Sequence, residues 1–313
     1  MSGNAERGGC WRRGWGSDGG PAGMNPWNRV LWLLAAAAAV VGLTVPLTGT
    51  HIAVPMLLLS VPFALIHGVR RYGWRTLLFF LIVTLVVSNF FENLSVSTGF
   101  PFGQYHYTGH PQLIHVPIEI GPIYFGLGYV CWQVANTLLD EADSCLGGSS
   151  GSVAGRVEVV ALPMLAAALM TMFDLGVDSI AATVKRVWVW EDGGGVFGVP
   201  YTNYLGWWFV TYLYFQIFAL YLMKRQPAST SVSVRTEGRG VLAQNVLFYG
   251  ALGLSSVPYF IGASGDMVKD GASVSWSGHA INETMMTINL FGMVVAAFLA
   301  AVKLARNDLA LRR

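Results

Sequence analysis

Five acidic residues lie at or near the ends of long apolar stretches: Glu92, Glu119, Asp174, Asp178 and Glu283. Ionisable groups at membrane depth are energetically costly, and where they occur they usually serve binding, proton transfer or catalysis. A carboxyl group surrounded by apolar side chains favours its neutral form, in which it can donate a proton. The five acids therefore point to proton chemistry inside an apolar protein.

The spacing of three of these acids suggests a common site. Asp174 and Asp178 stand four residues apart in TMFDLGVDSI, so a helix places them on one face. Two carboxylates at that spacing bind a divalent cation or share one proton, because both cannot ionise cheaply together. Glu92, in SNFFENLSVSTG, has Asn89 beside it on its own helix face.

The other two acids differ in their surroundings. Glu119, in HVPIEIGPIYFG, begins a predicted helix and is kept as a candidate catalytic acid. Glu283 follows His279 in HAINE, where a helix N-terminus stabilises a carboxylate without any further function. The histidines lack metal-ligand spacing and the three cysteines lack CxxC spacing, so we expect no metal, no zinc site and no disulfide framework.

The composition indicates that these acids belong to a helical membrane protein. Of the 313 residues, 54% are hydrophobic and only 12% are charged, and the mean hydropathy is +0.51. Soluble domains carry about 25% charged residues. No basic patch is interleaved with aromatic residues, so nucleic acid is not an expected partner.

We therefore predict an all-α, polytopic transmembrane bundle in one domain, residues 27–305, with a disordered tail at 1–26 and a C-terminal tail at 306–313. A span needs about 20 apolar residues. About eight stretches qualify: 28–48, 52–69, 75–97, 113–138, 158–182, 203–223, 242–262 and 281–303. The second contains two prolines, so a kink or a partly re-entrant segment is a further prediction there.

The distribution of Lys and Arg predicts the orientation. With the N-terminus inside, sixteen of the 19 basic residues fall on the inner side, and only Lys185, Arg186 and Lys269 fall outside. Cytoplasmic loops carry such an excess of Lys and Arg. Both termini are then cytoplasmic, the number of spans is even, and all five acids fall toward the outer face.

Two outer segments differ from plain connectors. Residues 98–111 (TGFPFGQYHYTGHP) and 187–202 (VWVWEDGGGVFGVPYT) combine Gly and Pro with Tyr, Trp and His. Irregular backbone at membrane depth must be buried in protein or line a wet cavity. We therefore expect both segments to fold over a site on the outer side.

The sequence around these acids resembles a known family. The segments FENLSVSTGFPFGQYHYT, HVPIEIGPIYFGLGY, FDLGVDSIAATVKRVWVWEDGGG and VFGVPYTNYLGWW are similar to those of the carotenoid biosynthesis membrane family, which includes CruF-type carotenoid 1,2-hydratases and the bisanhydrobacterioruberin hydratase. The resemblance covers roughly residues 75–220. Two departures are Ser179, where the family usually has proline, and the glycine-rich insert EDGGG.

The resemblance implies an integral membrane enzyme that adds water to the terminal isoprenoid double bond of an acyclic carotenoid, without a redox cofactor. It also implies a multi-pass protein of a bacterial or archaeal cytoplasmic membrane. Its partners would be a lipid-soluble carotenoid or polyprenyl substrate that arrives from the membrane lipid, and other enzymes of the carotenoid pathway.

Such a hydration needs a protonated acid, a pocket that tolerates a tertiary cation, and a positioned water. We assign Glu92, Asp174 and Asp178 to the donor and water-orienting roles, with Glu119 as a neighbour. The residues expected to line the substrate site are Asn89, Tyr105, Trp188, Trp190, Asn203 and Trp207.

Three other functions are also compatible with these residues. A cyclase or isomerase of carotenoids or terpenoids would use the same proton donor without capture of water. A magnesium-dependent prenyltransferase would use Asp174 and Asp178 as metal ligands. A proton-coupled transporter would use the acids as a relay.

Overall fold

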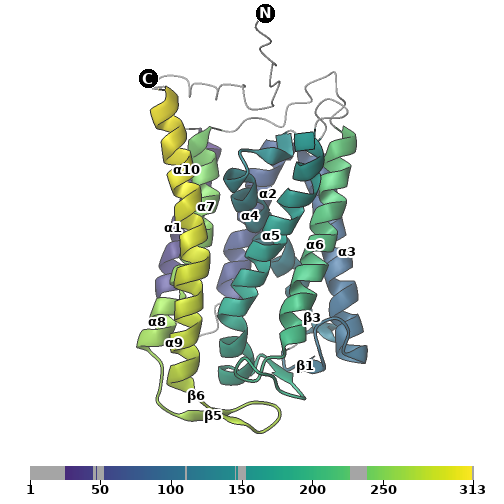
Figure 1. Cartoon of the computed structure of the whole chain (residues 1–313), viewed down its shortest axis with the longest axis vertical. Helices are drawn as coiled ribbons and strands as arrows, with labels where there is room; N and C mark the ends of the chain where they lie inside the picture. Colours follow the sequence, from purple (N-terminus) through teal and green to yellow (C-terminus); the bar gives the residue numbers. More distant parts are fainter. Residues whose placement is uncertain are drawn as a thin grey trace, which may run out of the picture.

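The protein is described here by a computed structural model that covers residues 25–44, 47, 53–109, 111–144, 146, 153–225 and 238–311. Long helices stand side by side in one bundle (Figure 1), which confirms the predicted all-α membrane fold. The predicted tail at 1–26 lies almost wholly outside the described residues. The helices are α1 (Pro26–Thr44), α2 (Ala53–Tyr72), α3 (Trp74–Thr98), α4 (Ile120–Leu138), α5 (Val153–Ser179), α6 (Tyr201–Arg225), α7 (Arg239–Leu254), α8 (Ser256–Ile261), α9 (Gly278–Asn289) and α10 (Val295–Leu311).

Several of these helices join into longer rods. A π-helical turn, η4 (Ile180–Val184), extends α5, and a second, η5 (Leu290–Val294), joins α9 to α10. Helix α8 continues α7 with one residue between them. α2 runs through Pro62 without interruption, so the predicted re-entrant segment is not found in its described part. α10 extends to Leu311, into the range predicted as a tail.

Six rods in the described part of the chain are long and apolar enough to cross a membrane, and they make this a multi-pass membrane protein. They contain α1, α3, α5, α6, α7 with α8, and α9 with α10. α2 and α4 stand at two further predicted spans but are not among the six. The total of eight spans therefore stays a prediction.

Helix α4 is the centre of the bundle. Every residue from Tyr124 to Thr137 is buried, and the helix packs against α2, α3, α5, α7 and α10. This complete burial explains how α4 can carry polar residues such as Gln133 and Asn136 in its interior, because neighbouring helices rather than lipid surround it.

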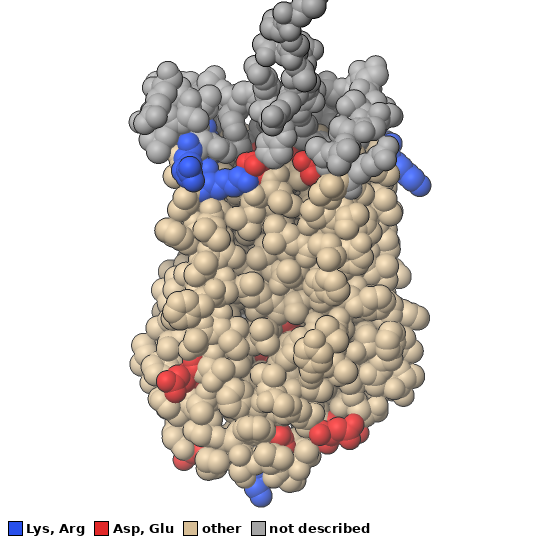
Figure 2. Space-filling model, viewed as in Figure 1, with Lys and Arg blue, Asp and Glu red and all other residues tan. Residues whose placement is uncertain are grey.

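The basic residues gather at one end of the bundle. Figure 2 shows Lys and Arg at the end where α10 finishes, and a broad band with few charges below them. Asn28, at the start of α1, lies at this end too: Arg70 of α2 donates to its side chain at 2.5 Å and Gln244 of α7 to its carbonyl oxygen at 3.3 Å. The described chain thus begins and ends at the same end of the bundle.

A buried ion pair holds this basic end together. Asp143, in the short 3-10 helix η3 (Ala142–Ser144), accepts hydrogen bonds from Arg71 at 2.8 and 3.0 Å and from the Tyr72 hydroxyl. The Tyr72 oxygen in turn accepts from Trp132 and Gln133 of α4, at 3.0 and 2.9 Å. A buried carboxylate held by a guanidinium partner and a phenol is a structural group.

In the described part of the chain, three short antiparallel ribbons lie among the connecting segments, and the labels β1, β3, β5 and β6 place them at the opposite end in Figure 1. They pair β1 (Tyr105–Tyr107) with β4 (Trp188–Trp190), β2 (Gln112–Leu113) with β3 (Val116–Pro117), and β5 (Met267–Lys269) with β6 (Ser275–Ser277). These strands add little to the all-α fold class. The first ribbon, however, positions side chains that the next section describes.

Candidate active site

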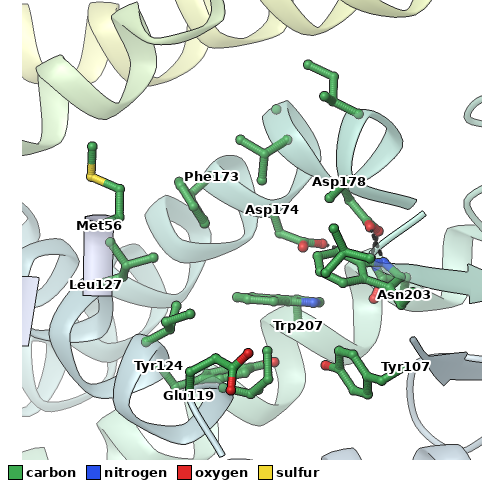
Figure 3. Close-up of a pocket in the computed structure, with 18 of the residues that line it drawn as sticks. Met56, Tyr107, Glu119, Tyr124, Leu127, Phe173, Asp174, Asp178, Asn203 and Trp207 are labelled. Carbon is green, nitrogen blue, oxygen red and sulfur yellow. Dashed lines mark hydrogen bonds between the residues drawn. The ribbon is translucent and has the colours of Figure 1, made fainter. Parts of the chain in front are cut away.

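A mostly apolar cavity of ≈ 180 Å³ lies within the bundle, toward the end that carries the β1–β4 ribbon. Its walls come chiefly from α4, α5 and the segments that carry β1, β3 and β4, with contributions from α2, α3, α6, α7, α8 and α9. Figure 3 shows it elongated: Asp178 and Asn203 stand at one side, Met56 and Leu127 at the other, with Phe173 between them. None of the described residues that line it is Lys, Arg or His.

The β1–β4 ribbon joins the two irregular segments that the sequence singled out. Tyr105 pairs with Trp190 and Tyr107 with Trp188, and all four side chains line the cavity. Successive residues of a strand point to opposite faces. The intervening His106 accordingly lies outside, where its ring stands 3.3 Å from exposed Glu191.

Glu92 lies on the buried face of α3 and accepts hydrogen bonds from three tyrosine hydroxyls. Tyr124 of α4 donates at 2.7 Å and Tyr107 at 3.0 Å, and Tyr105 donates to the same oxygen as Tyr107. Burial raises the pKa of Tyr105 and of Tyr107 well above the ordinary value, and nearby Glu92 raises it further. The two phenols therefore stay protonated as donors, and Glu92 serves as an acceptor.

Asp174 and Asp178 form the second acidic site of the cavity. These two carboxyl groups stand one turn apart on α5, and both are buried. One amide bridges them: Nδ2 of Asn203, in the first turn of α6, donates to Asp174 at 2.8 Å and to Asp178 at 2.6 Å. Trp188 donates its indole N–H to the other oxygen of Asp178 at 2.7 Å. Because no Lys or Arg lines the cavity, two charges here would repel without compensation, and the pair is suited to holding a proton.

The local backbone places Asp178 at a transition in α5. The α-helix ends at Ser179 and the π turn η4 follows at once. Single π turns are rare and are frequent at functional sites. This turn directs the chain into β4, so that Trp188 returns to Asp178 from ten residues further on.

Aromatic faces complete the wall between the carboxyl groups. Trp207 of α6 stacks on Tyr124 with ring centroids 4.6 Å apart and an interplanar angle of 16°. Tyr107 meets Trp188 edge to face at 5.9 Å. Aromatic π faces attract cations, most strongly when water is excluded.

Of the predicted site residues, the structure brings most to this cavity. Lining it are Glu92, Tyr105, Glu119, Asp174, Asp178, Trp188, Trp190, Asn203 and Trp207. Glu119 is only half-buried, directly before α4, and stands apart from Asp178 in Figure 3. Asn89 does not line the cavity: its amide donates to Leu85 within α3 at 2.8 Å and packs against Gly121.

Glu283 also lies elsewhere, as an exposed residue of α9. Its neighbour His279 is exposed as well, with its ring 5.2 Å from that of Phe260. Because α9 begins at Gly278, Glu283 stands in its second turn, past the first turn in which a helix N-terminus stabilises a carboxylate, so the helix-end interpretation of Glu283 is wrong.

Sequence reasoning missed two of the residues that contact Glu92. Tyr107 could have been found, because a two-residue spacing from Tyr105 places both on one face of a strand. Tyr124 carried no such signal, because an aromatic residue in an apolar helix is ordinarily a packing residue.

Comparison with known proteins identifies the family. The model of the carotenoid biosynthesis protein family matches residues 50–264, which contain the three buried acids of the cavity and their hydrogen-bond partners. Neither the curated proteins nor the solved structures contain a match to this chain. On the extent of the family match, the chain belongs to the carotenoid biosynthesis protein family.

Proposed function

We propose that this protein is an integral membrane hydratase, which adds water to the terminal isoprenoid double bond of an acyclic carotenoid. One observation carries the proposal: an apolar cavity holds a carboxyl pair suited to keeping a proton, facing a third carboxylate that only accepts hydrogen bonds. An apolar cavity fits a polyene, and the two kinds of carboxyl group fit a proton donor and a base.

The reaction follows from these two environments. The protonated member of the Asp174–Asp178 pair gives its proton to the less substituted alkene carbon, and a tertiary cation forms at the other carbon. The ring faces of Trp207 and Tyr124 and the negative charge of Glu92 stabilise that cation. Water then adds to the cation and transfers a proton to Glu92, and return of this proton to the aspartates completes the cycle.

The residues that donate hydrogen bonds to the two carboxyl sites also have roles in this proposal. Asn203 keeps both aspartates in place through one amide group. Tyr105 and Tyr107 hold the Glu92 carboxylate, and as uncharged phenols they add no charge to the cavity. No step requires a metal or a redox cofactor. The substrate reaches the cavity from the lipid, since a carotenoid is too apolar to travel through water.

A cyclase or isomerase is the second candidate, and the aromatic wall favours it as much as it favours a hydratase. The protonation step would be the same, and the cation would lose a proton or close a ring instead of capturing water. A prenyltransferase is less well supported, because diphosphate binding calls on Lys or Arg and none lines the described cavity.

Expression in a host that accumulates acyclic carotenoids tests the proposal. The wild-type chain should convert the pigment to a more polar alcohol, detected by chromatography and mass spectrometry. Glu92→Gln and Asp174→Asn should each lower the rate by at least about 100-fold, the range in which general acid–base groups contribute.

Glu283→Gln is the matched control, since Glu283 was another acid near the end of an apolar stretch and lies outside the cavity. It should convert pigment as the wild type does, at equal protein level in the membrane. Unchanged pigment conversion in both Glu92→Gln and Asp174→Asn would refute the proposed site.

A further inference from the structure

The cavity has a second polar end that the proposed reaction does not use. It is formed where α7, α8 and α9 meet α5, and its polar members include Ser255, Ser256 and Asn289. Gly176 of α5 also lies there. At 3.6 residues per turn, Gly176 points about 200° around the helix from Asp174. The cavity therefore continues around α5, from the carboxyl end to this second end.

Asn289 is the main feature of the second end. It is 1% exposed, and its amide N–H donates to the Gly176 carbonyl oxygen at 2.9 Å. That bond fixes the orientation of the amide, so the acceptor left without a donor is the oxygen. Among the described residues, Oδ1 of Asn289 has no hydrogen-bond partner. A buried carbonyl oxygen without a donor costs about 1–3 kcal/mol, so this oxygen is suited to a ligand.

The two serines add acceptors of the same kind. Ser255 donates its hydroxyl hydrogen to the Leu252 carbonyl oxygen at 2.6 Å, and Ser256 donates to the Gly253 carbonyl oxygen at 2.7 Å. A hydroxyl has one hydrogen and two lone pairs. Both serine oxygens have thus used their donor capacity and keep lone pairs for accepting.

Donor and acceptor capacity together define the ligand. Three oxygens at this end can accept, and the one spare donor among the three residues is the second N–H of the Asn289 amide. An O–H group can donate to these oxygens and accept from that N–H, so a ligand that brings a hydroxyl is favoured over one that brings a carbonyl oxygen, which can only accept. Phe173 and Val177 of α5 lie between this end and the aspartates and are apolar. A ligand that spans both ends is therefore apolar along its length and carries a hydroxyl group away from the reacting double bond.

We propose that Asn289, Ser255 and Ser256 form a hydroxyl-binding subsite, which holds an O–H group supplied by the polyene substrate or by a water molecule. That the ligand is a polyene rests on the proposed function. The subsite itself rests on the acceptor oxygens of these three residues. A subsite for a substrate hydroxyl would make this enzyme prefer polyenes that have already been hydroxylated.

The test compares lycopene with its monohydroxylated derivative. Binding is followed by quenching of the intrinsic tryptophan fluorescence of the full-length protein in detergent. The protein carries Asp174→Asn, so that no turnover occurs. A substrate hydroxyl in the subsite predicts that Ser255→Ala with Ser256→Ala weakens binding of the hydroxylated polyene by roughly two- to tenfold, the value of one neutral hydrogen bond, and leaves lycopene binding unchanged.

A water molecule in the subsite predicts a different pattern. The serine variant would then bind both polyenes as before, and in the otherwise intact enzyme it would form alcohol more slowly from both. Asn289→Leu, which removes the free oxygen by another route, should reproduce whichever pattern the serine variant gives. Ser97→Ala is the control, because Ser97 is exposed on α3 and donates to the Asn93 carbonyl oxygen in the same local manner.

The subsite is refuted if neither the binding of either polyene nor the rate of alcohol formation changes in the serine and Asn289 variants. The binding measurement needs no product, so it judges the subsite even if the protein proves to be a cyclase. Absence of alcohol from the wild type would refute hydration alone.

Discussion

At the scale of the residue, the hydrogen-bond partners of a buried carboxyl group separate a structural acid from a reactive one. Asp143 has a guanidinium partner in Arg71 and holds helices together. Glu92 and the Asp174–Asp178 pair have only uncharged donors, and they face a cavity. The sequence could indicate which acids were unusual, because charge is rare in apolar stretches. It could not indicate their partners, because Tyr124 and Asn203 reach them only through helix packing.

Tyr107→Phe tests the acceptor role of Glu92. The change removes one hydroxyl donor at 3.0 Å and keeps the ring. Because a hydrogen bond to a charged group contributes about 1.5–3 kcal/mol, the rate of alcohol formation should fall by about tenfold or more. A rate equal to that of the wild type, at the same membrane level, would contradict the role. Tyr201→Phe is the control, since Tyr201 is exposed and lies outside the cavity lining.

The dependence of activity on pH should reflect the protonation of two phenols that donate to Glu92. Their raised pKa means that Tyr105 and Tyr107 are protonated at every pH below their ordinary value of about 10. The donors are lost only as the pH rises above the raised pKa. The rate measured in detergent should therefore show no loss from tyrosine ionisation up to about pH 9. A titration near pH 9 that disappears in Tyr107→Phe would contradict this account.

At the scale of the element, the helices were predictable and the ribbon was not. Apolar runs of sufficient length define the rods, and the structure has them close to the predicted ranges. The sequence also showed that residues 98–111 and 187–202 were unlike plain connectors. Their pairing as β1 and β4 depends on contacts between residues some 85 positions apart, such as His106 and Glu191, and local sequence carries no signal for them.

Two adjacent glycines in the second segment provide a matched test of its fold. A Cβ at Gly194 would lie 2.1 Å from the Val199 carbonyl carbon, whereas a Cβ at Gly195 would meet nothing within 4 Å. Gly194→Ala must therefore displace the backbone that leads into Asn203 and α6. It should lower the free energy of unfolding by roughly 1–3 kcal/mol, and with it the melting temperature. Because the displaced backbone positions Asn203, the rate of alcohol formation should fall as well.

Gly195→Ala should match the wild type in both measurements, since it adds the same methyl group into open space. Equal behaviour of the two variants would show that the segment does not hold the site in the described conformation.

At the scale of the whole molecule, the distribution of charge predicts which end of the bundle faces the cytoplasm. Lys and Arg gather at the end where the chain begins and finishes (Figure 2), and the cavity lies toward the other end. The positive-inside tendency then predicts that the termini are cytoplasmic and that the cavity lies in the outer half of the membrane. The even number of spans and this orientation are predictions from the sequence.

Cysteine labelling in intact cells tests the orientation. In a chain freed of its native cysteines, Lys269→Cys should react with a membrane-impermeant maleimide from outside, because Lys269 is exposed on β5. Arg306→Cys, exposed near the end of α10, should react only after the membrane is permeabilised. The reverse pattern would place the cavity on the cytoplasmic side.

The capture of water is the central claim, and isotope labelling tests it most directly. Membranes that contain the protein are incubated with lycopene in oxygen-18 water, and the pigment is analysed by mass spectrometry. The account predicts a tertiary alcohol that carries the label, formed by the wild type and not by Asp174→Asn. An unlabelled isomer of the substrate as the product would contradict it and would identify the protein as a cyclase or isomerase.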